Sequence, residues 1–381
     1  MTLIPRFVRF CRFGTRHAAC PPHACLILFQ MKSLTILLTL AGLAGLTAAI
    51  AWTGFDSVLH AVSNIGFGGF LLTLAFQLIV NCVLGAAWHT AFPEISFRHL
   101  LGARMIRDAA GTCLPFSQVG GMVIGTRATC LRAVPGKSNG VGLTEATCAN
   151  IVDITTEVMG QIAFILLAVT FLIAQTGSSS PLVRPVLIGA ILLIFGIAGF
   201  VWTQRRSGKF ISSAVRFLGR HIAGQWQNGA TDNAEQVNEY MERAWSRTGR
   251  IAAGAAIHLI GWIGSAGVLW LTYKLLHADL GFAGAIAIEG VACGVMSASF
   301  LVPAGLGVQE GAYMTLGAAF GIDPTISLGI SLLRRARELS IGIPVLAIWQ
   351  ISEMYLLKQN NKSLEPAETT LPSPSGDQHV G

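Results

Sequence analysis

Long apolar runs separated by short polar gaps dominate the amino-acid sequence. Four of them approach or exceed the ~20 residues that a helix needs to cross the hydrocarbon core of a bilayer. More apolar residues surround His258, and a final run at 326–351 follows a turn. The pattern predicts a series of membrane-spanning α-helices. The first four runs lie at 33–52, 67–88, 158–174 and 182–202.

Proline and glycine interrupt two further apolar segments, one in each half of the chain. Because proline lacks a backbone donor and glycine relaxes the backbone, neither segment is expected to form an unbroken helix. Irregular backbone at membrane depth is tolerated only where protein or water covers it. The interruptions therefore predict two re-entrant hairpins, and their recurrence favours inverted repeats with a binding site at the breaks. The first interruption, at 114–121, contains Pro115, Gln118, Gly120 and Gly121 and precedes Arg127, and the second, at 303–311, contains Pro303, Gly305, Gly307, Gln309 and Glu310.

These elements predict an all-α integral membrane protein. We expect a polytopic helical bundle with six full spans and two re-entrant broken-helix hairpins. Residues 1–30 are either a basic tail or the product of an upstream start codon. Residues 31–355 form the expected transmembrane domain, which includes a polar loop at 203–250. The polar residues 356–381 are expected to be disordered.

Composition and charge support membrane insertion and exclude several functions. The chain is 52% hydrophobic and only 12% charged, too little charge to cover a soluble domain of 381 residues. Its net charge of +7 lies in gaps between apolar runs, which indicates topology signals and no nucleic-acid surface. The positive N-terminal segment and the 203–250 loop predict that both termini are cytoplasmic. Eight cysteines without a C-x-x-C pair indicate neither a zinc site nor a disulfide framework. No phosphate-binding loop or hydrolase motif is present, and we expect no cofactor or metal.

Polar residues recur on one face of the third full span. They follow one another at steps of three and four, which places them on the same side of a helix. A carboxylate at membrane depth is unfavourable unless it is paired or hydrated, so this face should meet a cavity or a cationic partner. The alternative is that only Glu157 lies deep, with Asn150 and Asp153 at the helix end. The residues are Asn150, Asp153, Glu157 and Gln161.

The last span carries charges that also need partners. Glu338 can pair with Arg334 four residues earlier, which leaves Arg335 and Arg337 to meet Asp153, Glu157 or an anionic ligand. An internal ion-pair network that only stabilises the bundle is the alternative.

Other charged or polar residues have two interpretations each. Glu310, beside a helix start, either caps exposed amides or handles substrate or protons. Asp108 and Arg127 are expected to anchor the first hairpin at the level of the lipid headgroups. His258 is expected to be a hydrogen-bonded packing residue.

The two interrupted motifs, together with the Leu-Leu-Arg-Arg-Ala-Arg-Glu segment at 332–338, resemble the HpnL-type membrane proteins associated with hopanoid biosynthesis. Those proteins belong to the wider family of the lysylphosphatidylglycerol synthase transmembrane (flippase-like) domain. The resemblance covers roughly residues 31–355 and implies lipid translocation in the bacterial inner membrane, with hopanoids or anionic lipid headgroups, and hopanoid biosynthetic proteins, as partners. Many relatives have arginine and glutamate in the first motif, where this chain has Ser117, Gln118 and Gly121.

The sequence thus favours a lipid transporter without enzymatic activity. A membrane enzyme that modifies a polyprenyl or hopanoid lipid is the first alternative, with Asp153, Glu157 or Glu310 as acid or base. An accessory scaffold that holds biosynthetic enzymes through the 203–250 loop is the second. The scaffold would tolerate neutralisation of the buried charges, whereas the transporter would not.

Overall fold

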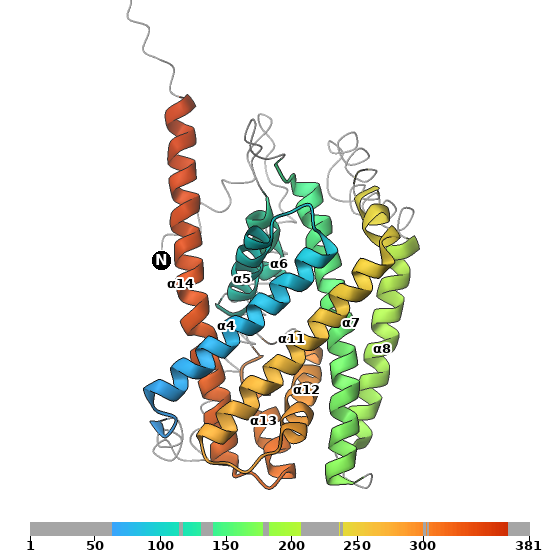
Figure 1. Ribbon diagram of the computed structural model, residues 1–381, viewed down its shortest axis with the longest axis vertical. Coiled ribbons are helices and arrows are strands. Elements are labelled where there is room, and N and C mark those ends of the chain that lie inside the picture. The colour runs from blue at the N-terminus through green and yellow to red at the C-terminus, as the bar shows by residue number, and fades with distance from the viewer. Residues whose placement is uncertain are drawn as a thin grey trace, which may run out of the picture.

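The computed structural model describes nearly all of the chain between residues 63 and 364. The described ranges are 63–113, 117–130, 140–177, 183–206, 236, 239–299, 302 and 305–364. Within them all long elements are α-helices and no strand occurs, which confirms the all-α prediction (Figure 1). The helices are α4 (Gly66–Ala91), α5 (Phe97–Cys113), α6 (Ser117–Thr129), α7 (Leu143–Thr176), α8 (Val183–Arg206), α11 (Thr248–Leu275), α12 (Phe282–Ala298), α13 (Val308–Ala319) and α14 (Pro324–Leu364).

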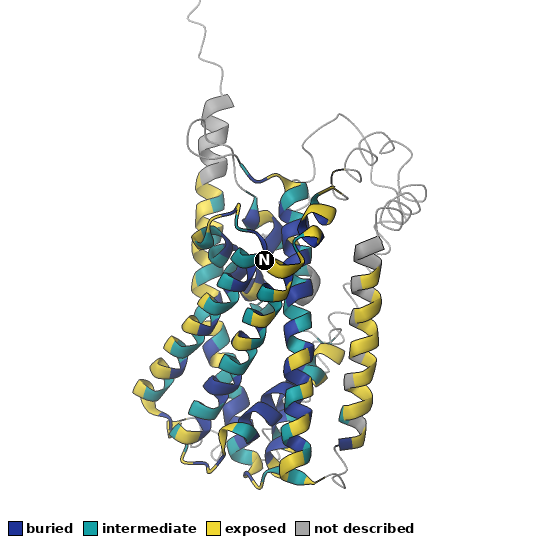
Figure 2. Cartoon of the chain, turned by 45° about the vertical axis from the view of Figure 1, so that its right-hand side comes forward, coloured by how far each residue is buried: buried dark blue, intermediate teal, exposed yellow. Residues whose placement is uncertain are grey.

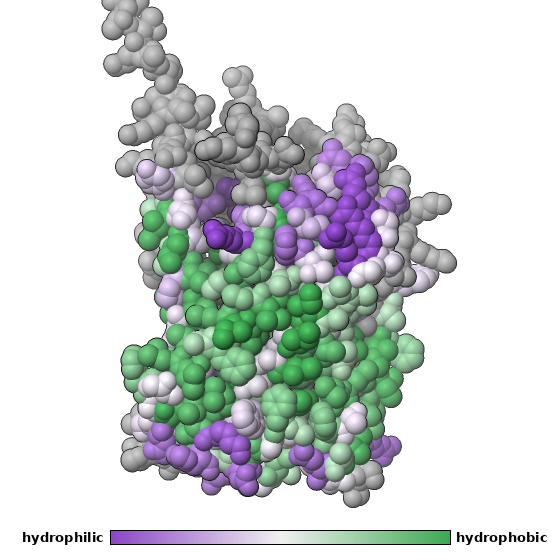
Figure 3. All heavy atoms as spheres, in the orientation of Figure 1, coloured by the Kyte–Doolittle hydropathy of each residue, from purple (hydrophilic) through white to green (hydrophobic). Residues whose placement is uncertain are grey.

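The surface of the molecule matches a bilayer. Among the described residues, α4, α7 and α11 have the length and apolar composition to cross a membrane. In the view of Figure 3, apolar residues form a band across the middle, and hydrophilic residues gather above and below it. Large apolar side chains are exposed along the helices, for example Phe195 at 72% and Ile79 at 61%. Such exposure is unfavourable in water and favourable in lipid, so the chain is a polytopic membrane protein.

Two helix hairpins enter the bundle from opposite ends. In Figure 1, α5 and α6 lie in the upper half of the molecule, whereas α12 and α13 lie in the lower half. The ends of α5 and α12 that adjoin the two interruptions, at Thr112 and Ser297, line the same cavity. Helix α5 packs against α14, as α12 packs against α7, and α4 packs along α11. The units α4–α7 and α11–α14 therefore have the same order and equivalent contacts in opposite orientation, the arrangement of inverted repeats.

Helix α8 lies outside this pair of units. It contacts mainly α7, and its described side chains are mostly exposed (Figure 2). The last helix, α14, continues to Leu364, past the predicted end at residue 351. The added residues include Met, Leu, Lys and Gln and contain no proline, so they favour a helix once the last span has started one.

Several predictions concern segments outside the described residues. These are the N-terminal tail at 1–30, the expected first span at 33–52, much of the 203–250 loop and the tail beyond residue 364. The two motif prolines, Pro115 and Pro303, also lie outside them, as does the side chain of Gln118. The number of six spans and the domain boundaries stay predictions.

Close contacts between helix backbones depend on glycine. At Gly160 in α7, an added Cβ would lie 2.8 Å from the carbonyl oxygen of Ala255 and 2.8 Å from Cβ of His258, both in α11. At Gly290 in α12, it would lie 2.4 Å from Cβ of Ala168 in α7. Because α7 touches both neighbours through these positions, its polar face is brought to the centre of the bundle.

Candidate functional site

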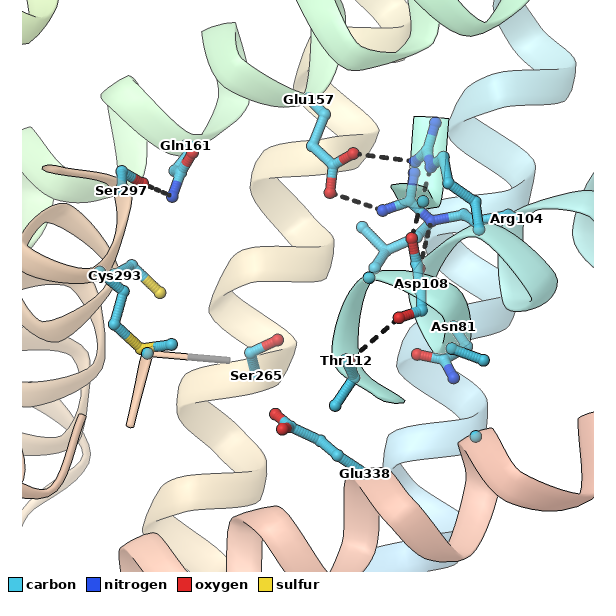
Figure 4. Close-up of a pocket in the computed structure, with 18 of the residues that line it drawn as sticks. Asn81, Arg104, Asp108, Thr112, Glu157, Gln161, Ser265, Cys293, Ser297 and Glu338 are labelled. Atoms are coloured by element: carbon cyan, nitrogen blue, oxygen red, sulfur yellow. Dashed lines mark hydrogen bonds and ion pairs between the residues drawn. The ribbon is translucent and has the colours of Figure 1, made fainter. Parts of the chain in front are cut away.

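A cavity with both polar and apolar lining residues lies between the two hairpins. Its volume is about 460 Å³, and α4, α5, α6, α7, α11, α12, α13 and α14 contribute to its wall. In Figure 4, Ser265 of α11 points into the space between Cys293 of α12 and Thr112 of α5, and Glu338 of α14 approaches from another side. Described residues at or beside both interruptions also line it, namely Gly111 and Thr112 at the first and Ser299, Val302 and Gly305 at the second. A cavity is therefore present beside the breaks, and a binding site there stays a prediction.

The acidic face of α7 meets two arginines of α5 at one side of this cavity. Arg107 donates from Nη1 to Oδ2 of Asp153 at 2.7 Å and from Nη2 to Oε2 of Glu157 at 3.1 Å. Arg104 donates to the same pair of carboxylates, at 3.1 Å to Asp153 Oδ2 and 2.6 Å to Glu157 Oε1 (Figure 4). Asp153 is completely buried. Both carboxylates therefore lie inside the helix bundle and are paired with arginine, whereas the depth of Asn150 and Asp153 in the membrane stays a prediction.

Three further groups complete this first cluster. Asp108, also on α5, lies 3.3 Å from Nε of Arg104 and is partly exposed. Nε2 of the buried His258 lies 3.2 Å from Oδ1 of Asp153. The guanidinium of Arg107 stacks over the ring of Trp88, 5.2 Å from its centroid. His258 is thus a hydrogen-bonded residue in the packed interior, as expected, and Asp108 pairs with its own helix.

A second cluster links α12, α13 and α14 at the other side of the cavity. Arg334 donates from Nη1 to Oε1 of the buried Glu289 at 2.5 Å, and from Nε to Oε1 of Glu338 at 3.0 Å. The hydroxyl of Tyr313 donates to Oε2 of Glu289 at 2.5 Å. The predicted Arg334–Glu338 pair is therefore present, and Glu289 is a second partner of the same arginine.

Glu310 joins the start of α13 to α14. Its Oε2 accepts a hydrogen bond from the backbone N–H of Gly307 at 2.8 Å, which caps the helix, and its Oε1 accepts one from Nε of Arg335 at 2.5 Å. Arg335 also donates to the carbonyl oxygen of Gly305 at 3.2 Å. Gly305 and Gly307 have φ angles of 58° and 78°, which only glycine adopts readily. Arg335 therefore does not reach Asp153 or Glu157, and the predicted capping by Glu310 is present.

The two clusters are related by the inverted repeats, with opposite charges. Arg104 in α5 and Glu289 in α12 occupy the same position counted from the first residue of their helices. Asp153 in α7 and Arg334 in α14 also correspond. The ion pair between Arg104 and Asp153 is thus repeated between Glu289 and Arg334 with acid and base exchanged. Both pairs tie a broken hairpin to a long helix beside the cavity.

Arg337 differs from the other buried arginines. Arg337 is 7% exposed and lines the cavity. Within the described part of the chain it forms no ion pair, and its Nε has no hydrogen-bond partner. An unpaired guanidinium in a buried position is unfavourable, so it is the group in the cavity wall most in need of a counter-ion.

The remaining predicted residues fall into two groups. Gln161 and Gln309 line the cavity, and they donate hydrogen bonds to Oγ of Ser297 and Oγ of Ser331, respectively. Asn150 is buried and donates to Oγ1 of Thr129. The others belong to the hairpins or lie at the rim. Gly120 and Gly121 lie in the first turn of α6, and Gly121 touches α5 and lines the cavity. Arg127 pairs with Glu353 at 3.1 Å.

Sequence reasoning missed two central residues of the site, Arg104 and Arg107. In the sequence they contribute to the positive charge between apolar runs, which is interpreted only as a topology signal. Their spacing of three residues, followed by Asp108, places the charges on one helix side and was the available signal. Among the described residues, no group of three or more His, Cys, Asp or Glu is arranged to hold a metal ion.

No curated protein matches the chain. The model of the family described as "Lysylphosphatidylglycerol synthase TM region" matches residues 36–345, which includes both hairpins and both ionic clusters. The chain therefore belongs to the family of the lysylphosphatidylglycerol synthase TM region.

Proposed function

We propose that this protein is a lipid transporter that moves a hopanoid or a related polar lipid across or within the bacterial inner membrane. The polar headgroup passes through the cavity between the hairpins, while the apolar tails remain in the surrounding lipid. The observation that carries the proposal is the cavity of about 460 Å³ that lies between two oppositely directed broken hairpins. Its size lies within the roughly 300–1,000 Å³ that is usual for ligand sites.

The wall of the cavity supports passage of a polar group. Moving a charged or hydroxylated headgroup through hydrocarbon is unfavourable by several kcal/mol because its hydrogen bonds to water are lost. Side chains that line the cavity can replace those bonds at mid-membrane depth. The neutral polar ones are Gln77, Asn81, Thr112, Gln161, Ser265, Ser297, Ser299 and Gln309.

The state of the carboxylates favours transport over catalysis. Asp153, Glu157 and Glu310, the candidates for acid or base chemistry, each accept hydrogen bonds from arginine. Such pairs hold charge in place, and a general base needs a free lone pair in reach of its substrate. In this proposal the clusters position the hairpins, and membrane lipids are the ligands. A covalently changed lipid product formed by the purified protein would support the enzyme alternative instead.

Transport is tested by leaflet exchange of a fluorescent polar lipid or hopanoid in proteoliposomes. Wild-type protein should accelerate exchange over protein-free vesicles. Ser265→Trp places a large ring inside the cavity and should reduce exchange to the protein-free rate. The matched control is Ile260→Trp on the same helix, where the side chain is 58% exposed toward lipid, and it should leave exchange unchanged. Equal rates in the two variants, or no acceleration by wild-type protein, would contradict the proposal.

A further inference from the structure

Arg337 is buried in the cavity wall without a partner that neutralises it. A guanidinium has five N–H donors and remains charged under all ordinary conditions. Its Nε has no acceptor among the described residues, although the residue is only 7% exposed. Every other arginine of the two clusters has at least one carboxylate within 3.1 Å.

The nearby carboxylates are already engaged. Glu289 and Glu338 both bind Arg334, and Glu310 binds Arg335 and the backbone of Gly307. Arg334 therefore takes two carboxylates while Arg337, one helical turn later, takes none. The donors of Arg337 are left to the cavity, which its side chain lines.

An oxyanion is the ligand chemistry that satisfies this arrangement. A phosphate or carboxylate offers two oxygens at the spacing of the guanidinium fork and supplies the missing negative charge. A hydroxyl group would accept one hydrogen bond and leave the charge uncompensated. Neutral acceptors in the wall, such as Gln161 and Ser265, are suited to polar groups next to the anion.

We infer that Arg337 is the anion subsite of the cavity, and that the lipid headgroup it receives carries a phosphate or a carboxylate. This inference rests on the proposed function, because it names the chemical class of the group that enters the cavity. The other arginines hold the bundle together through their carboxylate partners, and Arg337 binds the ligand.

Binding is tested directly, without transport, on purified full-length protein in an uncharged detergent. Native mass spectrometry measures the dissociation constants of three lipids with the same oleoyl chains: dioleoyl phosphatidic acid, dioleoylglycerol and oleic acid. Inorganic phosphate, followed by thermal stabilisation, separates binding of a free anion from binding of a lipid headgroup. The variants are Arg337→Gln and Arg337→Lys. Arg243→Gln, which removes an exposed arginine paired with Glu239, is the matched control.

Wild-type protein should bind phosphatidic acid at least about tenfold more tightly than dioleoylglycerol, since a charged hydrogen bond in a buried site contributes on this order. Arg337→Gln should abolish the difference, Arg337→Lys should retain part of it, and Arg243→Gln should retain all of it. Oleic acid places a carboxylate at the same subsite and should show the same dependence on Arg337. Stabilisation by inorganic phosphate that Arg337→Gln removes would identify the free anion as sufficient.

Two results would overturn the inference. One is equal binding of phosphatidic acid to wild-type protein and Arg337→Gln. The other is an equal loss in Arg337→Gln and Arg337→Lys, which would indicate a steric effect. Leaflet exchange distinguishes failure of the anion subsite from failure of the transport proposal. If Arg337→Gln binds and moves lipids as wild-type protein does, only the anion subsite is wrong. If no lipid moves but anion binding depends on Arg337, the subsite stands and transport is wrong.

Discussion

Arg337 and Asp153 represent two ways in which a buried charge affects stability. The carboxylate of Asp153 is contacted by Arg104, Arg107 and His258, so its negative charge is compensated. Arg337 has no comparable partner among the described residues. Removing a compensated charge and removing an uncompensated one should therefore have opposite effects on the free energy of unfolding.

Arg337→Met should stabilise the ligand-free protein. The substitution keeps a long flexible side chain in the same space and removes the unfavourable burial of an unpaired charge, a gain on the order of 1–3 kcal/mol. Thermal unfolding in detergent without added lipid should show a higher midpoint than wild-type protein. A lower midpoint would mean that Arg337 has a stabilising partner, and the anion subsite would lose its main support.

Asp153→Asn should destabilise the protein by about 3–5 kcal/mol, because Arg104 and Arg107 would be left with less negative charge in a buried position. The control is Glu239→Gln, whose exposed pair with Arg243 should contribute about 0–1 kcal/mol. Both are compared by thermal unfolding of the purified proteins. Similar midpoints for the two variants would show that the first cluster does not stabilise the bundle.

The sequence was sufficient to find one member of each ion pair in the first cluster, but not the other. The spacing of Asp153 and Glu157 predicts a polar helix face, because this depends on one helix alone. Their partners come from α5, about 50 residues earlier, and lie in a segment whose positive charge has an equally good explanation as a topology signal. Only the ion pairs between side chains of α5 and α7 in the structure distinguish the two explanations.

Helix positions were predictable where hydropathy alone decides them. The run predicted at 67–88 corresponds to α4, and the run at 182–202 corresponds to α8. Helix α7 begins at Leu143, before the apolar run at 158–174, because the segment ahead of that run carries the polar face that starts at Asn150 and is buried against other helices. A hydropathy pattern cannot distinguish a polar loop from a polar helix that is covered by protein.

The contact between α7 and α11 should be sensitive to side-chain size at Gly160. Gly160→Val would force the two backbones apart, and overpacking of this kind is unfavourable by about 1–3 kcal/mol. Gly189→Val in the peripheral α8, where an added Cβ meets nothing within 4 Å, is the control and should change the midpoint much less. Thermal unfolding measures both. Equal midpoints would mean that the backbones of α7 and α11 are farther apart at Gly160 than in the structure.

The inverted order of the two units makes a topological prediction. The loop between α4 and α5 and the loop between α11 and α12 lie toward opposite ends of the molecule (Figure 1). Ser96 and Asp279 are exposed in these two loops. The distribution of positive charge predicts that Ser96 is cytoplasmic and Asp279 periplasmic.

Single cysteines in a cysteine-free background test this arrangement in a bacterial host. A membrane-impermeant maleimide should label Asp279→Cys in intact cells and Ser96→Cys only after the inner membrane is permeabilised. Labelling of both positions in intact cells would contradict the inverted arrangement. Labelling of Ser96→Cys alone would retain the arrangement and reverse the orientation.

Exchange of acid and base between the two units could not be predicted from the motifs. The two interruptions share a glutamine followed two residues later by glycine, Gln118–Gly120 and Gln309–Gly311. The ion pairs in which acid and base are exchanged, Arg104–Asp153 and Glu289–Arg334, lie on helices outside the motifs. Their equivalence becomes visible only when α5 is compared with α12 and α7 with α14. The consequence is a cavity with an ion-pair cluster on either side, and each cluster links a broken hairpin to a long helix.

The location of the headgroup is the central claim, and photochemical cross-linking measures it most directly. Two forms of one polar lipid carry a diazirine, either on the headgroup or at the end of an acyl chain, and adducts are mapped by peptide mass spectrometry. The headgroup probe should label cavity peptides that contain Ser265 or Ser297, and the acyl probe should label exposed residues of α8 such as Leu192. Labelling of only lipid-facing residues by both probes would contradict entry of the headgroup into the cavity.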